Sequence, residues 1–349
     1  MDSRRGPRAG GGGGRRPGAA GTEGGAALRV VVSLGVLALL LVLLPLDDLW
    51  GALRRLSPVV WLGVLGGFLS GHALGVIKWR RMLAVGRAPL SARDGARCYA
   101  AGLFANLCLP SIVGGDVLRA VLAGRATGRA EAVVVGSIGD RLCDVFALGV
   151  LIGGGALIAR TALPGWWSNV VVVLALAGLA GGALFIPLIL RRPLSAWPDR
   201  VRRQVGRTMV ALRRLARGPG PAFLVLAMSL AIQTTFILLN AWLGRSVGVD
   251  APLAAWFVAW PAAKLAGLMP VSLGGLGVRD ATLGAALVPF GVPMATGVAV
   301  SLVWQTVLVA GGLLAGGVWV LLGSGTGEVG TSLRAIRRSP ESRGAGGIE

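Results

Sequence analysis

Long apolar runs constrain the fold of this chain more than any other feature of its sequence. A bilayer core is about 30 Å thick, so a helix that crosses it needs about 20 mostly apolar residues. Six runs of about that length cover residues 28–46, 58–77, 132–158, 167–190, 221–244 and 293–322. With 54% hydrophobic and 14% charged residues, the chain is typical of an integral membrane protein, and a soluble enzyme is nearly excluded.

Two further apolar regions, 98–123 and 253–290, are interrupted by proline and glycine. The interrupting residues are Pro110, Gly114 and Gly115 in the first region and Pro270, Gly274, Gly275 and Gly277 in the second. At membrane depth a broken helix is tolerated only inside protein or against a water-filled cavity. We therefore expect each region to form a re-entrant hairpin of two short helices.

The placement of arginine and lysine predicts the orientation of the spans. Basic residues are concentrated in segments 1–27, 78–97 and 191–219, and the alternate connections carry little net charge. Cytoplasmic segments of membrane proteins carry the excess of Lys and Arg. We expect both termini to be cytoplasmic in a multi-pass protein of the cell membrane. The fold class is then all-α, with about six full transmembrane helices and two hairpins of opposite orientation in an inverted repeat.

Polar segments frame this membrane domain, which we place at 28–322. Residues 1–27 are rich in glycine and arginine and predict a disordered basic tail, not a cleaved signal peptide. Residues 323–349 predict a disordered cytoplasmic tail. The two halves of the membrane domain are about 28–190 and 221–322.

The segment between the halves, 191–219, has a helical apolar pattern. Its apolar residues recur at spacings of four and three, and these are Val201, Val205, Met209, Leu212 and Leu215. Arginines occupy the remaining faces, which predicts a basic amphipathic helix on anionic lipids of the inner leaflet. An ordinary positive-inside loop that happens to be helical remains the alternative.

The charge balance and the scarcity of metal ligands exclude several functions. The 35 Lys and Arg outnumber 15 Asp and Glu, but nearly all arginines lie between apolar runs, so we do not expect nucleic-acid binding. The three cysteines lack metal-ligand spacing and His72 is the single histidine, so we expect no metal site and no cofactor. Only two basic residues, Lys78 and Lys264, are lysine, which we attribute to coding bias.

The two broken regions share a sequence motif. Both read P-x-x-x-G-G-x-x-x-R, from Pro110 to Arg119 and from Pro270 to Arg279, which indicates an internal repeat. The proline ends one half-helix, the glycines permit a tight turn, and the next half-helix begins with free N–H groups. An arginine one turn further in makes this an anion site, and two opposed sites resemble the midplane site of inverted-repeat transporters.

Polar side chains in the apolar regions complete the candidate site. The expected substrate-binding residues are Arg119, Arg279, Gly114, Gly115, Gly274, Gly275, Asn106 and Lys264. The expected charge-balancing or gating residues are Asp116, Asp140, Arg141, Asp144 and Asp280. A purely structural network of ion pairs is the alternative for these charges. For Gln233, Asn240 and Gln305 we expect interhelical hydrogen bonds, and for His72 packing at a helix interface.

Three segments resemble the lysylphosphatidylglycerol synthetase transmembrane domain family. They read "NLCLPSIVGGDVLRAVL" from residue 106, "GDRLCDVFAL" from residue 139 and "LMPVSLGGLGVRDATL" from residue 268. The resemblance covers about 28–322, although the family tends to have Glu where this chain has Asp280. It implies a membrane flippase that carries lipids with modified head groups, or polyprenyl-linked sugars, between leaflets. Bifunctional members carry a soluble aminoacyl-transfer domain that we do not expect here, so lysyl transfer is not expected.

We therefore expect a non-enzymatic, flippase-like transporter whose Arg119 and Arg279 hold a lipid phosphate. One alternative is a non-transporting membrane scaffold that recruits a cell-envelope enzyme through 191–219. A second is a membrane-embedded enzyme with a metal bound by Asp140 and Asp144. The expected partners are membrane lipids, either phospholipid or polyprenyl-linked, and the sequence is compatible with a homo-oligomer.

Overall fold

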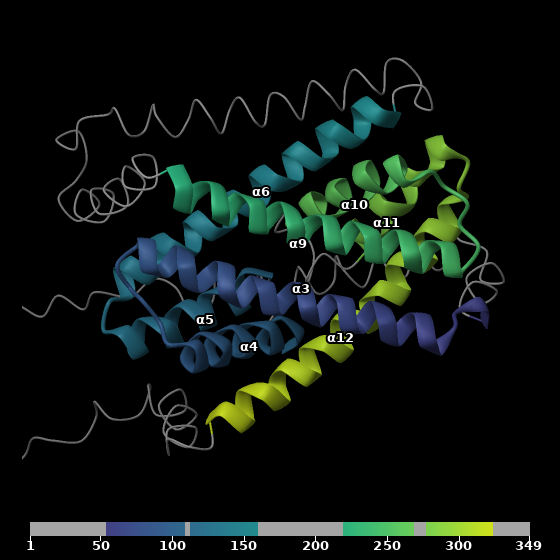
Figure 1. The fold of residues 1–349 in the computed structure, drawn as a ribbon. Coiled ribbons are helices and arrows are strands. Elements are labelled where there is room, and N and C mark those ends of the chain that lie inside the picture. Colours follow the sequence, from purple (N-terminus) through teal and green to yellow (C-terminus); the bar gives the residue numbers. More distant parts are fainter. Residues whose placement is uncertain (1–53, 109–111, 160–218, 269–276, 324–349) are drawn as a thin grey trace, which may run out of the picture.

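Helices form all of the secondary structure in the described part of the chain (Figure 1). The computed structural model describes residues 54–108, 112–159, 219–268 and 277–323. The helices are α3 (Pro58–Val85), α4 (Ala92–Cys108), α5 (Ile112–Thr127), α6 (Ala130–Ile158), α9 (Pro219–Ser246), α10 (Leu253–Gly267), α11 (Val278–Leu287), the 3-10 helix η4 (Val288–Phe290) and α12 (Met294–Gly323). The predicted all-α class is confirmed for these residues.

Four of these helices, α3, α6, α9 and α12, are long and apolar enough to cross a membrane. They coincide with four of the predicted spans, and α3 continues to Val85, past the predicted end at residue 77. The other two predicted spans, 28–46 and 167–190, lie outside the described residues, as do both predicted tails and the predicted amphipathic helix at 191–219. The protein is thus a multi-pass membrane protein, with four candidate spanning helices in the described part of the chain.

Proline and glycine set several helix ends. Helices α3 and α9 begin at Pro58 and Pro219, where the missing N–H of proline has no intrahelical partner to lose. Gly291 follows η4 with φ of 80°, a left-handed conformation that glycine adopts without steric cost. Pro261 lies inside α10 without ending it.

Each broken region forms two helices that are too short to cross a bilayer alone. Helices α4 and α5 have 17 and 16 residues, and α10 and α11 have 15 and 10. The two members of each pair pack against each other. In Figure 1, the ends of α4 and α5 that point away from the break between them lie beside the C-terminal end of α3. The corresponding ends of α10 and α11 lie toward the opposite end of the long helices. The breaks themselves, 109–111 and 269–276, lie outside the described residues.

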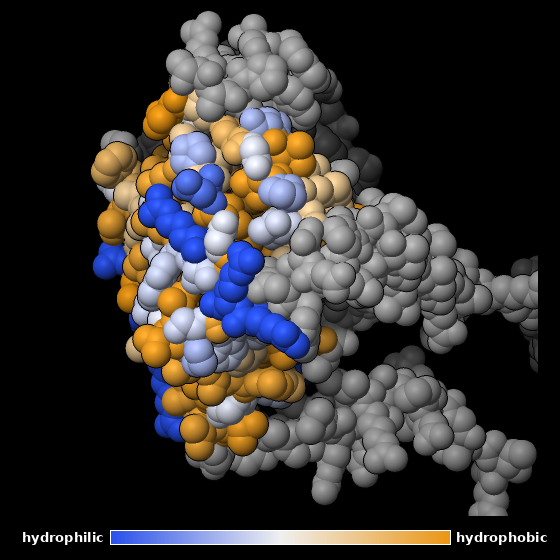
Figure 2. Space-filling model, turned by 90° about the vertical axis from the view of Figure 1, so that its right-hand side faces the viewer, coloured by the Kyte–Doolittle hydropathy of each residue, from blue (hydrophilic) through white to orange (hydrophobic). Residues whose placement is uncertain are grey.

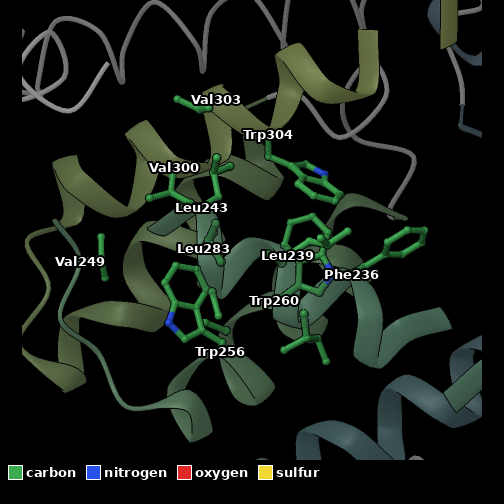
Figure 3. Packing of buried hydrophobic residues seen from close by; sticks show 14 of the residues in the cluster. Phe236, Leu239, Leu243, Val249, Trp256, Trp260, Leu283, Val300, Val303 and Trp304 are labelled. Carbon is green, nitrogen blue, oxygen red and sulfur yellow. The ribbon is translucent and has the colours of Figure 1, made fainter. Parts of the chain in front are cut away.

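Two apolar clusters hold the helices together. The larger one joins α3, α9, α10, α11 and α12 around Phe236, Trp256, Trp260 and Trp304 (Figure 3). Trp260 and Trp304 meet edge to face, with ring centroids 5.0 Å apart. The smaller cluster surrounds Trp79 at the contact of α3, α4, α5 and α6. Many large apolar side chains remain exposed, and Figure 2 shows such side chains spread over one face of the molecule, as a lipid-facing surface requires.

The glycine pair of the first motif does not form the turn between two helices. Gly114 and Gly115 lie inside the first turns of α5, so this part of the prediction is wrong. The Gly115 N–H donates to Asn106 Oδ1 of α4 at 3.1 Å, and a Cβ at Gly115 would contact the Gly102 carbonyl oxygen of α4. The glycine is thus needed for close approach of two helix backbones.

Gly115→Ala is expected to destabilise the protein by about 1–3 kcal/mol, because the added methyl group has no room between α4 and α5. Thermal unfolding in detergent, followed by circular dichroism, measures the effect. Gly66→Ala in α3 is the matched control, since its Cβ would meet nothing within 4 Å. That control should gain about 0.5–1 kcal/mol, as alanine stabilises a helix interior. Equal unfolding temperatures for both variants would contradict the close-approach explanation.

Candidate functional site

Six charged side chains from three helices form one network in the interior. The members, which we call the charge network, are Lys78 of α3, Asp116 and Arg119 of α5, and Asp140, Arg141 and Asp144 of α6. Three cations face three carboxylates, so their formal charges cancel. Intramembrane charges are costly unless they pair, and this arrangement pairs every one of them.

Asp140 lies at the centre of the charge network. Its Oδ1 is 3.1 Å from Lys78 Nζ, and its Oδ2 accepts a hydrogen bond from Arg119 Nη2 at 3.2 Å. Each of these three side chains is only 3% exposed. Lys78 also donates to Asp144 Oδ1 and to Ser229 Oγ of α9, so a single ammonium connects α3, α6 and α9.

Aromatic rings complete the surroundings of Arg119. Its guanidinium carbon lies 5.0 Å from the centroid of the Trp79 ring and 5.2 Å from that of Tyr99. Its Nε is 3.2 Å from Asp116 Oδ1. Two carboxylates and two π faces therefore bind one guanidinium, an environment that lysine would not match.

Arg141 is the accessible member of the charge network. Its side chain is 45% exposed, whereas that of Arg119 is 3% exposed. It donates to Asp116 Oδ1 and lies 3.7 Å from Asp144 Oδ2. The side chains of these two aspartates are 20% and 14% exposed, so this edge of the network can be reached from outside.

A second, smaller cluster surrounds Asp280 at the start of α11. Asp280 accepts hydrogen bonds from the Gly277 N–H at 2.9 Å, from Arg279 Nη2 at 3.0 Å and from Ser301 Oγ at 2.5 Å. Arg279 also donates to Gln305 Oε1 at 2.8 Å, which connects α11 to α12. The carboxylate therefore caps its own helix and compensates a buried arginine.

The two motif arginines occupy different places in their helices. Arg119 lies about two turns after the start of α5 at Ile112. Arg279 follows directly after Val278, the first residue of α11. Equal spacing in sequence thus does not give equal positions, and Gly274 and Gly275 lie outside the described residues.

Asn106 and Lys264, two further predicted substrate ligands, have protein partners. Asn106 accepts from the Gly115 N–H, as described above. Lys264 of α10 donates to Gln233 Oε1 of α9 at 2.7 Å, and its Nζ lies 5.2 Å from the centroid of the Phe236 ring. Within the described ranges, no carboxylate lies within ion-pair distance of Lys264.

The uncharged polar side chains follow the predictions with one exception. Gln233 and Gln305 make the expected interhelical hydrogen bonds. Asn240 instead donates to the Phe236 carbonyl oxygen within α9, because that acceptor lies one turn earlier in the same helix. His72 packs at an interface as expected, with Nδ1 3.2 Å from the Tyr99 hydroxyl oxygen.

Sequence reasoning missed Lys78, which it assigned to a cytoplasmic basic segment. The signal that could have identified it is the use of lysine in place of arginine. The chain has only two lysines, Lys78 and Lys264, among its 35 Lys and Arg residues. Both project into polar contacts between helices, which each ammonium makes as a compact point charge. Asp140 and Asp144, the carboxylates that a metal-dependent reaction would need, both bind the Lys78 ammonium.

Comparison with known protein families confirms the family resemblance that the sequence motifs suggested. The model of the family described as the lysylphosphatidylglycerol synthase TM region matches residues 27–316. No curated protein and no solved structure matches the chain significantly. The match includes both motifs, the whole charge network and every described helix up to most of α12. The chain therefore belongs to the lysylphosphatidylglycerol synthase TM region family.

Proposed function

We propose that the protein is a flippase-like transporter that moves an anionic or head-group-modified lipid between the leaflets of the cell membrane. The observation that carries the proposal is the charge network between α3, α5 and α6. Ionisable residues within membrane spans are costly and commonly mark the path of a substrate or ion. Family membership adds the expectation of a lipid-related function.

The network supports transport because its ion pairs can exchange partners. A guanidinium binds two phosphate oxygens as readily as two carboxylate oxygens. Arg119 is shared by Asp116 and Asp140, and Arg279 is bound by Asp280, so in this proposal a lipid phosphate replaces one carboxylate on an arginine. Displaced Asp116 or Asp140 keeps Arg141 or Lys78, and displaced Asp280 keeps the Gly277 N–H and the Ser301 hydroxyl. In this proposal the aspartates compensate the arginines whenever no phosphate does.

We further propose that the two broken regions are re-entrant hairpins in an inverted repeat. Both helices of each pair are shorter than the span of about 20 residues that a bilayer requires. Their outer ends lie toward opposite ends of the long helices (Figure 1). Two hairpins that enter from opposite sides would place both motifs near the midplane, with both termini in the cytoplasm.

Lipid translocation in proteoliposomes tests the function. Wild-type protein is expected to move at least one of a panel of fluorescent anionic, zwitterionic, aminoacylated and polyprenyl-linked lipids. Arg119→Ala combined with Arg279→Ala should lower the rate by about tenfold or more, because each arginine supplies charge-assisted hydrogen bonds.

Arg81→Ala is the matched control, because Arg81 is an exposed arginine near the end of α3. It should transport like wild type. Unfolding temperatures of all variants separate loss of transport from loss of fold. Absence of movement for every lipid of the panel would contradict the flippase proposal, and full transport by the folded double variant would contradict the role of the two arginines.

A further inference from the structure

We propose that Arg141 and Lys264, and not the two motif arginines, make the first contact with the lipid phosphate, at an accessible edge between α6 and α10. This inference rests on the proposed function and names its entry site. It assigns to Arg141 a binding role where the sequence suggested charge balance. The ligand class is a lipid whose head group carries a phosphate.

The first argument is accessibility. The Arg141 side chain is 45% exposed, against 3% for Arg119 and 8% for Arg279. Arg141 lies about 17 Å from the start of the spanning helix α6, near its middle. An exposed guanidinium in a candidate spanning helix is costly among acyl chains, so we expect the exposed side of Arg141 to meet water or a lipid head group. An arriving phosphate meets this arginine before it can reach the buried ones.

The second argument is charge compensation. Charges cancel within the charge network and between Arg279 and Asp280. Lys264 is partly exposed and bonds to the neutral Gln233 side chain, with no carboxylate within ion-pair distance in the described part of the chain. Lys264 is therefore a half-buried cation of the described part with no carboxylate of its own, and a phosphate would supply the missing negative charge.

The third argument is that the two cations share a neighbourhood. Helix α10 packs against α6. Gln233, which binds Lys264, lies one helical turn from Ser229, which binds Lys78, and Lys78 and Arg141 both contact Asp144. Lys78, at 2.5 Å, already neutralises Asp144, so this carboxylate does not repel an anion strongly. A phosphate at this edge would gain a guanidinium with two donors and an ammonium as a point charge.

Equilibrium binding to the full-length protein in detergent tests the assignment without requiring transport. The probes are fluorescent phosphatidylglycerol and fluorescent polyprenyl phosphate, followed by anisotropy. Arg141→Gln and Lys264→Gln should each weaken binding of the preferred probe by about tenfold to a hundredfold, the effect of losing one charge-assisted contact. Arg141→Lys and Lys264→Arg keep the charge and should recover most of the affinity, whereas the exposed control Arg81→Gln should bind like wild type.

The outcomes separate the sites and the lipid sources. Weaker binding in Arg119→Gln, with normal binding in Arg141→Gln and Lys264→Gln, would overturn the proposal in favour of a motif arginine. Failure of wild type to bind either probe would overturn it as well. The tighter probe identifies which lipid supplies the phosphate. If wild type binds through these residues but moves no lipid, the flippase proposal fails and the binding site stands. Should Arg141→Gln fold poorly, Lys264→Gln decides, because Lys264 lies outside the charge network.

Discussion

Asp140→Ala is expected to lower the free energy of unfolding by about 3–5 kcal/mol, because it removes one carboxylate from two buried cations at once. Lys78 would retain Asp144, and Arg119 would retain the partly exposed Asp116. Neither cation can move into water from its buried position. Thermal and denaturant unfolding of the purified protein in detergent measure the change.

Asp250→Ala is the matched control for this prediction. Asp250 lies in the connection between α9 and α10, is exposed, and should change stability by no more than about 0.5 kcal/mol when it is replaced. A variant that removes both charges, Asp140→Ala with Arg119→Met, should recover part of the loss, since an apolar pair leaves no uncompensated ion. If Asp140→Ala unfolds at the wild-type temperature, the charge network does not hold α3, α5 and α6 together.

The spanning helices were predictable because bilayer thickness imposes a length on them. Each of the four described candidate spans coincides with a predicted apolar run, and their ends agree within a few residues. The exception is the C-terminal end of α3, which lies beyond the predicted end. The length rule depends on local sequence only, which explains why it succeeds. Proline is a weaker guide, because Pro261 lies inside α10 without ending it, and Pro110 and Pro270 lie outside the described residues.

Contacts between helices were not predictable in the same way. Lys78 follows an apolar run, so the positive-inside rule assigned it to the cytoplasm, yet α3 continues past it and Asp140 and Asp144 of α6 bind it. Gly115 illustrates the same limit. Glycine suits a tight turn and a close helix contact equally well, and only the position of α4 distinguishes the two.

The sequence singled out most of the charged residues that the structure brings together, but not the contacts among them. The sequence singled out Arg119 and Arg279 through one shared motif, and both are buried and bound by aspartate. Arg119, however, stacks on Trp79 and Tyr99, whereas Arg279 bonds to Gln305. A repeat in sequence fixes which residue types recur, but the neighbouring helices determine what each residue contacts.

Asp280→Ala is expected to cost about 3–5 kcal/mol of unfolding free energy, comparable to the loss of Asp140. Asp280 is fully buried, and its carboxylate accepts hydrogen bonds from the Gly277 N–H, Arg279 and Ser301. Removal leaves the start of α11 without its cap and Arg279 with only the neutral Gln305 side chain among its described partners. Unfolding in detergent measures the change, and the start of α11 should lose protection from hydrogen exchange.

Two milder variants separate the negative charge of Asp280 from the hydrogen bond by which it caps α11. Asp280→Asn keeps an oxygen for the Gly277 N–H but removes the negative charge, so it should fall between wild type and Asp280→Ala. Ser301→Ala removes one donor to the same carboxylate and should cost about 1 kcal/mol. If Asp280→Asn is as stable as wild type, the cap accounts for the role of Asp280 and Arg279 does not need its charge. If Asp280→Asn is as unstable as Asp280→Ala, compensation of the buried Arg279 accounts for the whole role of Asp280, and the hydrogen bond to the Gly277 N–H contributes nothing.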